Sequence, residues 1–347
     1  MKYNPLQIAT LIICCMLCVT SCSSDSVYEP ESDKGVEMSF DMASESRATT
    51  TVLDEFSVYG EMKYQTGAAD PIVIFDKTQV VNRDGVWSYK GTQYWFPKHE
   101  HSFVAVSPSS SLESTASPQY INSKLSFIFT MPTYSGKEMQ ETQDKNELLD
   151  IVAATHRRFY NGSEKDGVIS LRFGHLLSKI NFAPRFEDNT VKKDDYIQFH
   201  KIEISGLKKK AKIAVTPASL LENPQTDDRL IEFSEYDGTD NLTITFNGSK
   251  IVSNSQQINL FADADALKML PQLFEATSEA TVRFSYSFKE DSENQRVGSI
   301  SLGGQEWKPG AAYTYNFTVD KMGLNLEKPT IKEWDSVNIS DVKWIVE

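Results

Sequence analysis

Cysteine is scarce in this chain and confined to its first residues. The four cysteines are Cys14, Cys15, Cys18 and Cys22, and the first three lie within one apolar run. If that run is removed as an export signal, one cysteine remains, which excludes internal disulfides and thiol chemistry in the mature chain. A protein of 347 residues can bury enough apolar surface to fold without covalent links.

Positive charge is also in deficit. The chain has 35 Lys and Arg against 48 Asp and Glu, which gives a formal net charge of -13. A surface that binds a nucleic acid backbone needs a basic face to neutralise phosphates. We therefore expect no nucleic-acid partner.

Long hydrophobic runs are missing apart from residues 6–20, which are too few to span a bilayer as a helix. Lys2 precedes this run and Val19-Thr20-Ser21-Cys22 ends it, as in an export signal. Small residues before a cysteine resemble a bacterial lipobox, in which Cys22 is diacylated and becomes the first residue after cleavage. The alternatives are a plain signal peptide or a buried strand.

The lipobox predicts a signal peptide over residues 1–21 and a lipid anchor that holds the protein on a membrane without crossing it. Residues 22–35 are rich in Ser, Asp, Glu and Pro and have few core-forming side chains. Such a composition is typical of a flexible tether between anchor and folded part.

Helical periodicity is rare, and the best candidates are Ala264 to Phe274, interrupted by Pro271, and a short turn near Glu147 to Ile151. Short strands spaced by turn residues, without alternating helices, instead predict an all-β fold of two antiparallel β-sandwich domains, over residues 36–165 and 166–347. The predicted strands are 36–42, 56–59, 102–106, 125–131, 168–173, 179–182, 198–204, 242–246, 258–261, 281–288 and 313–319. The predicted turns are Arg83-Asp84-Gly85, Asn161-Gly162, Asp237-Gly238, Asn247-Gly248 and Gly303-Gly304.

Reactive groups in a recognisable arrangement are lacking. His99 and His101 form a lone His-x-His without a third ligand at a familiar spacing, so we expect solvated or turn histidines. His175 has apolar neighbours that favour a hydrogen-bonded packing role. No nucleophile elbow and no phosphate-binding glycine pattern occurs. The sequence therefore predicts no enzyme, no cofactor and no metal, and a surface hydrolase would need a cluster of acids that cannot be located.

Aromatic residues gather at Trp87, Tyr89, Tyr94, Trp95 and Phe96. Aromatic side chains suit pleated sheets, which favours a role as core and cross-strand partners. The alternative is a platform of Trp87, Tyr94 and Trp95 for a sugar, which would make the protein a monomeric surface glycan-binding lipoprotein.

Several short strings follow one another along almost the entire chain: the lipobox at Cys22, Ser46-Arg47-Ala48, Phe56-Ser57-Val58-Tyr59, Trp87-Ser88-Tyr89, Tyr94-Trp95-Phe96-Pro97, residues 103–108, residues 148–154, residues 168–180, residues 269–272, Trp307-Lys308-Pro309-Gly310, Tyr313-Thr314-Tyr315 and Ile331-Lys332-Glu333-Trp334. In this order they resemble the fimbrillin family, the Mfa-like pilins of the type V pilus system in Gram-negative anaerobes. The departure from the family pattern is Glu147 before Leu148-Leu149, where an Asp is common.

The resemblance implies two sandwich domains of transthyretin-like type and a fimbrial subunit that serves adhesion. It implies a trypsin-like surface protease that cuts between Arg47 and Ala48 and detaches a lipidated strand around Val36 to Met42. A strand of the next subunit would then fill the vacated groove. An exposed arginine in an inert loop is the alternative interpretation of Arg47.

The expected donor strand is C-terminal, because Val342, Trp344 and Val346 form an apolar face. The alternative is that this tail closes its own domain as a final strand. The expected partners are other pilin subunits, the surface protease and the outer membrane through the lipid anchor. The expected location is the outer membrane surface and, after processing, the fimbrium. Stalk, tip and anchor roles are not separated by the sequence.

Overall fold

A computed structural model describes residues 35–42, 53–64, 70–112, 118–131, 138–140, 150–163, 165–187, 195–218, 229–253, 257–263 and 266–334. Within these ranges the chain folds almost entirely into β-strands, and the single helical segment is the 3-10 turn η1 (Ser109–Leu112). The expected all-β sandwich class is confirmed. No helix in the described ranges is long and apolar enough to cross a membrane.

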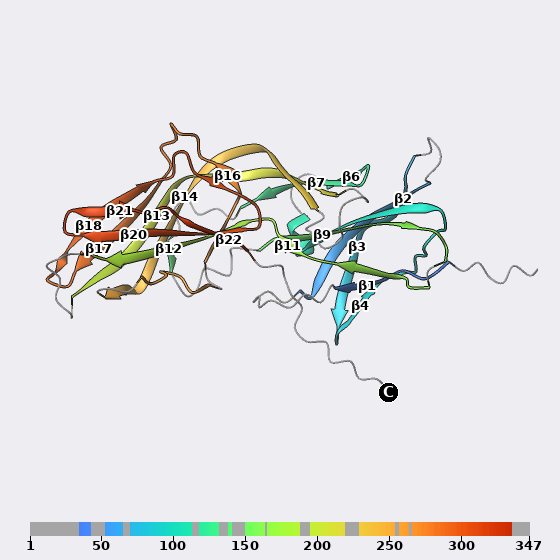
Figure 1. The fold of residues 1–347 in the computed structure, drawn as a ribbon, viewed down its shortest axis with the longest axis horizontal. Helices are drawn as coiled ribbons and strands as arrows, with labels where there is room; N and C mark the ends of the chain where they lie inside the picture. The colour runs from blue at the N-terminus through green and yellow to red at the C-terminus, as the bar shows by residue number, and fades with distance from the viewer. Residues whose placement is uncertain are drawn as a thin grey trace, which may run out of the picture.

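The N-terminal half is organised by one antiparallel sheet, here called the N-terminal sheet, in the order β11-β9-β5-β2-β3-β4 (Figure 1). The β3–β4 hairpin turns at Asp84 and Gly85, whose φ angles of 54° and 86° suit a tight hairpin turn, as the Asp-Gly sequence predicts. The bounds are β11 (Gly174–His175), β9 (Val152–Tyr160), β5 (His99–Ser107), β2 (Glu55–Tyr64), β3 (Ile72–Arg83) and β4 (Val86–Tyr89).

Both faces of the N-terminal sheet are covered, which explains the continuous apolar run in β5. Phe103 and Ala105 belong to one apolar cluster, together with Phe40 of strand β1 (Ser39–Met42). Val104 and Val106 point to the other face and belong to a second cluster that continues into the C-terminal half. Side chains alternate between the faces of a strand, so one strand serves two cores.

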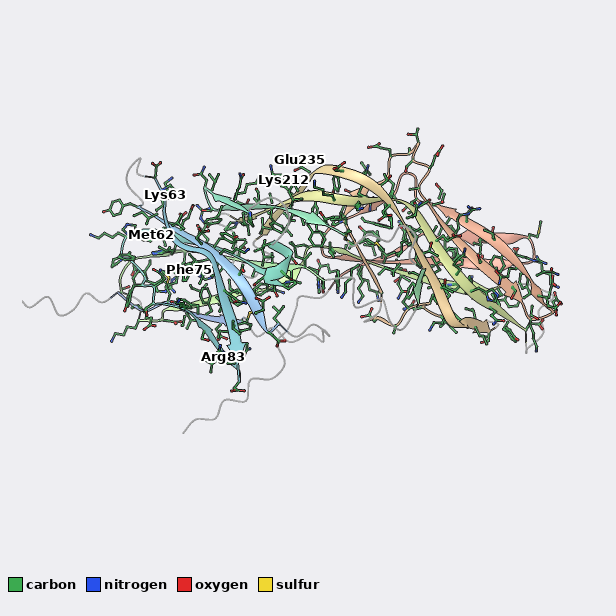
Figure 2. All side chains as sticks on the ribbon, turned by 180° about the vertical axis from the view of Figure 1, so that it is seen from behind. Met62, Lys63, Phe75, Arg83, Lys212 and Glu235 are labelled. Carbon is green, nitrogen blue, oxygen red and sulfur yellow. The ribbon has the colours of Figure 1, made fainter. Side chains whose placement is uncertain are left out.

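Two long antiparallel strands, β13 (Tyr196–Pro217) and β14 (Arg229–Ser253), form a ribbon that runs from the C-terminal sheets toward the N-terminal half (Figure 1). At 22 and 25 residues they are several times longer than usual strands, with a span of about 70 Å. Lys212 and Glu235, joined at 2.9 Å, lie in the part of the ribbon nearer the N-terminal sheet (Figure 2).

The ribbon is the centre of a seven-stranded sheet in the order β18-β17-β13-β14-β8, with β7 paired to β13 and β6 paired to β7. Strand β7 belongs to the first predicted domain, yet it pairs with β13 of the second. The division at residue 165 stays a prediction. The remaining bounds of this sheet are β6 (Gln119–Ile121), β7 (Lys124–Thr130), β8 (Glu138–Gln140), β17 (Thr281–Phe288) and β18 (Asp291–Ser301).

A second C-terminal sheet packs against the first in the order β15-β12-β20-β21, with β22 also paired to β20. Strands β12 and β20 run parallel, unlike most neighbouring pairs of the fold. The bounds are β15 (Leu267–Met269), β12 (Ser178–Phe186), β20 (Ala311–Asp320), β21 (Gly323–Leu326) and β22 (Thr330–Glu333), and β16 (Gln272–Leu273) pairs separately with β19 (Glu306–Trp307).

Three sequence expectations about secondary structure are wrong. Residues 258–261, expected as a strand, are not in one: Ile258 N and Leu260 N donate to Pro184 O and Phe182 O of β12, but these isolated bonds do not extend into a ladder. The segment expected to be a helix up to Phe274 contains the short strands β15 and β16 instead, because Leu267 and Met269, on alternate residues of β15, both enter the C-terminal core. The expected turns at Asp237-Gly238 and Asn247-Gly248 lie inside β14. Asp237 pairs with Lys210 next to a register shift, and Gly238 has φ 65°, so this turn-forming pair makes a bulge rather than a chain reversal.

The C-terminal core contains one buried polar pair, Trp307 and Tyr315. Trp307 Nε1 donates to the Tyr315 hydroxyl at 2.8 Å, and both residues are buried. Burial raises the pKa of Tyr315 to about 12, so the hydroxyl stays protonated. We expect Trp307→Phe and Tyr315→Phe each to lower the free energy of unfolding by about 1–3 kcal/mol, because each leaves a buried polar group without its partner.

The double variant should lose less stability than the sum of the two single variants, since both polar groups are then gone. Denaturant unfolding of the four proteins in a double-mutant cycle measures this. Strict additivity would show that the hydrogen bond contributes nothing to stability.

Candidate functional site

The residues predicted as sites from the sequence fall outside the described ranges, so their roles stay predictions. They are Cys22 for lipidation, Arg47 and Ala48 for processing, and Val342, Trp344 and Val346 for the donor strand. The strand predicted around residues 36–42, by contrast, is described and lies at a defined place in the fold.

Residues 35–42 are inserted between two backbone segments, and this place is here called the slot. On one side β1 runs parallel to β10 (Val168–Leu171), with Ser39 opposite Val168 and Met42 opposite Leu171. On the other side the chain lies against residues 93–95. Figure 1 shows β1 beside β3 and β4, at the side of the N-terminal sheet.

Backbone hydrogen bonds hold the inserted segment on both sides. Met38 N donates to Gln93 O at 2.8 Å, Trp95 N donates to Val36 O at 2.9 Å, and Ser39 N donates to Gly167 O at 3.1 Å. These bonds set the register of the segment, as ladder bonds do inside a sheet. The segment is thus part of the sandwich although it precedes the N-terminal sheet in the sequence.

Tyr89 adds a side-chain bond at the centre of the slot. Its hydroxyl donates to Met38 O at 2.9 Å and accepts from Gln93 N at 3.1 Å. Burial raises the pKa of Tyr89, so the hydroxyl keeps its proton and remains a donor. One side chain therefore links the inserted segment to the wall of the slot.

Apolar side chains of the segment alternate with exposed ones, as the sequence pattern predicts. Met38 and Phe40 are 1% and 6% exposed, whereas Glu37, Ser39 and Asp41 are exposed. Each buried side chain of this size contributes about 1.5–3 kcal/mol relative to an exposed one. The segment is thus held by two large side chains and a set of backbone bonds.

Phe40 is the main apolar contact of the slot. Its ring packs edge-on against Phe56, Phe75 and Tyr89, with centroid distances of 5.7, 5.5 and 5.6 Å. Figure 2 labels Phe75 within the N-terminal half, between Met62 near one end of the sheet and Arg83 at the other. Edge-to-face pairs add to the energy of burial alone.

Glycine at position 167 permits the close backbone approach that closes the slot. A Cβ atom there would lie 1.9 Å from Glu37 O, which is too close for any residue other than glycine. The Trp95 ring lies beside it and donates from Nε1 to Gly167 O at 2.9 Å. The Trp95 side chain is fully buried, so the sugar platform considered from the sequence lacks this ring at the surface.

Two histidines pack around Trp95, and one of them corrects a prediction. His101, expected to be solvated, is fully buried at 4.8 Å from the Trp95 ring, and its Nδ1 has no hydrogen-bond partner. His156 lies 6.4 Å from Trp95 and its Nδ1 contacts Ser170 O of β10 at 3.2 Å. Both rings therefore support the walls of the slot. The His-x-His spacing gave no signal of burial, because it does not show which sheet face has a core above it.

The pKa of His101 and of His156 is lowered to about 4 each, chiefly by burial and to a lesser extent by the Arg158 guanidinium, 5.0 Å from the centre of the Trp95 ring. The backbone hydrogen bond to His99 opposes this and raises the pKa of His101, and it outweighs the charge repulsion from the His99 ring. The described residues contain no group of three or more His, Cys, Asp or Glu side chains placed to hold a metal ion. Trp95, His101 and His156 pack together in the N-terminal half, and protonation of the two histidines in acid destabilises the fold.

Loss of the Phe40 side chain should loosen the slot. We expect Phe40→Ala to lower the free energy of unfolding by about 3–5 kcal/mol, because it leaves a cavity among three aromatic rings. Hydrogen exchange of residues 38–42 and 168–171 should become faster. Met322→Ala is the control, since Met322 is 97% exposed, and unchanged protection in Phe40→Ala would contradict the assigned packing.

Acid should destabilise the N-terminal half through its buried histidines. An unfolded histidine has a pKa near 6.5 and the folded His101 has one of about 4, so the unfolded chain binds protons first and stability falls as pH drops from about 7 to 4. Between pH 7.5 and 5, protonation of His101 alone should lower the free energy of unfolding by about 2 kcal/mol.

Thermal unfolding at the two pH values measures this loss, and His101→Gln should reduce it whatever its effect at pH 7.5. His200→Gln is the matched control, because His200 lies in β13, away from Trp95, and is only partly buried. Equal pH dependence in wild type and His101→Gln would refute the role of this ring.

This chain is similar to known proteins in both sequence and fold. The fimbrillin-like family matches residues 44–334. A crystal structure of a fimbrial protein from Bacteroides vulgatus superposes with a TM-score of 0.58 at 16% identity, over 86% of this chain and 99% of that one. None of the curated proteins matches the chain.

Two further solved structures are similar over comparable lengths. A putative cell adhesion protein from Bacteroides ovatus has 15% identity and a TM-score of 0.49, over 88% of this chain and 99% of that one. A fimbrial assembly protein from Parabacteroides distasonis has 11% identity and a TM-score of 0.39, over 85% and 98%. The family match covers far more than half of the sequence, and this chain therefore belongs to the fimbrillin-like family.

Proposed function

We propose that this protein is a fimbrial subunit that serves adhesion at the cell surface and polymerises by exchanging the strand in its slot. The observation that carries the proposal is the insertion of residues 35–42 between β10 and residues 93–95. In this view β1 is a temporary occupant, and a strand of a second subunit replaces it.

The order of features along the chain supports this proposal. Cys22, the expected lipid site, precedes β1, and Arg47, the expected cut site, follows it. A cut between Arg47 and Ala48 by a trypsin-like surface protease separates β1 and the lipid from the folded body. After the cut, β1 is retained by noncovalent contacts alone, and the lipid anchor to the outer membrane leaves with it.

Departure of β1 leaves a surface that favours a replacement strand. Phe56, Phe75 and Tyr89 lose the ring of Phe40, and β10 loses the only ladder partner it has among the described residues. An unpaired strand edge above exposed apolar rings is the setting in which strand addition is favourable. The energy for assembly then comes from burial and needs no cofactor.

The replacement strand must place apolar side chains at alternate positions, as Met38 and Phe40 do. Val342, Trp344 and Val346 have this spacing, which makes the C-terminal segment of another subunit the proposed donor. The partners proposed are therefore other pilin subunits, whether identical or related, and the fimbrium is the final location.

Processing of the full lipoprotein by an arginine-specific protease tests the proposal. We expect one product beginning at Ala48, identified by mass spectrometry, followed by ladders of multimers that survive mild detergent. Arg47→Gln should stay uncut and monomeric. Arg83→Gln is the control, because Arg83 is an exposed arginine beside the β3–β4 turn, and it should behave as wild type. A cut chain that remains monomeric would refute assembly by strand exchange.

A further inference from the structure

The last described residue, Trp334, lies face to face on a buried histidine. The rings of Trp334 and His175 are parallel within 3°, with centroids 3.6 Å apart. His175 is 2% exposed and belongs to β11, which pairs with β9 of the N-terminal sheet. Trp334 follows β22 of the second C-terminal sheet, so the stack joins the two halves of the molecule.

A buried carboxylate fixes the histidine ring. His175 Nδ1 lies 2.9 Å from Asp150 Oδ2, and the two side chains are 1% and 6% exposed. Leu176 N donates to Ile151 O at 2.9 Å, which holds the backbone of this segment on β9. The contact with Asp150 thus holds the His175 ring in one orientation. This geometry agrees with the hydrogen-bonded packing role predicted for His175.

Trp334 is fixed by two further contacts. The backbone N–H of Trp334 donates to Gly310 O at 2.8 Å, and Gly310 N donates to Leu177 O at 3.0 Å. The Lys179 ammonium lies 5.7 Å from the centre of the Trp334 ring, on the second C-terminal sheet. Three sequence strings that are far apart, around His175, Gly310 and Trp334, therefore meet at one point.

Apart from the stack, strand β22 is held by its ladder with β20 and by one side-chain bond, in which Asn316 Nδ2 donates to Thr330 Oγ1 at 2.8 Å. All four of its residues are exposed, including Ile331 at 57%, and it pairs only with Ala311 to Thr314 of β20. A short edge strand that buries no side chain is marginally stable, because the loss of chain entropy is not offset by apolar burial. The stack at its end supplies the missing burial.

We propose that Asp150, His175 and Trp334 form a clasp that fixes the base of the C-terminal segment, residues 335–347, at the junction of the two halves. Trp334 and His175 are positioning residues: they set where the segment starts, and they do not enter the slot of a neighbour. The consequence for assembly rests on the proposed function, in which residues 335–347 are the donor.

Opening the clasp lengthens the tether in the proposed assembly. With Trp334 seated, the tethered donor is counted from residue 335, and with β22 detached it is counted from residue 328. The effective concentration of a tethered segment falls with about the 3/2 power of its length, which amounts to about twofold here. Loss of a fixed starting direction adds to this reduction.

Hydrogen exchange on the intact chain tests the clasp without reference to assembly. In Trp334→Ala we expect exchange in residues 330–333 to be at least tenfold faster than in wild type. Trp334→Phe, which keeps a flat ring over His175, should restore most of the protection. Ile331→Ala is the matched control, because it changes an exposed residue of the same strand and leaves the stack intact. Unchanged exchange in Trp334→Ala would overturn the clasp.

Assembly of the processed chain separates positioning from a merely structural role. A synthetic peptide of residues 335–347 should bind the opened slot of Trp334→Ala and of wild type equally, because the slot is untouched. Multimers of Trp334→Ala should form at least twofold more slowly than those of wild type and of Ile331→Ala. Equal rates would overturn the positioning role, whereas wild type that fails to form multimers would refute the proposed function and leave the exchange result to decide the clasp.

Discussion

The seating of Phe40 among three aromatic rings, with backbone bonds on both sides of its strand, is the interaction on which the N-terminal half depends. The rings of Phe56, Phe75 and Tyr89 come from β2, β3 and β4, so one side chain connects three strands of the sheet. In the proposed processing β1 lies on the amino-terminal side of the cut, so this core would contain a strand that can be exchanged. Removal of β1 would leave Phe56, Phe75 and Tyr89 without the ring of Phe40.

Much of this arrangement could be predicted from the sequence. The alternation over Val36 to Met42 predicts a half-buried strand, and the Asp84-Gly85 pair predicts the hairpin that the structure has. The parallel pairing of β1 with β10 could not be predicted, since it joins segments more than a hundred residues apart and no local pattern records a partner. Apolar alternation shows that a strand has a buried face but not which strand lies beside it.

Other features escaped prediction for specific physical reasons. The Asp237-Gly238 pair normally turns a chain, but here it is absorbed as a bulge in β14, because the long partner β13 supplies hydrogen bonds on both sides of it. The stack of Trp334 on His175 depends on the meeting of two sheets, which no sequence period reports. The six residues predicted for lipidation, processing and strand donation lie outside the described ranges and rest on sequence resemblance.

The β13–β14 ribbon has a mechanical consequence. Its two strands run through the C-terminal core and along β7 with only local register shifts, so no flexible linker is required to connect the halves through it. Bending the molecule at its middle would require many ladder bonds to break together, unlike rotation about a single-chain hinge. Each subunit should therefore behave as a stiff rod, and the compliance of any filament built from such rods would reside at the joints between neighbours.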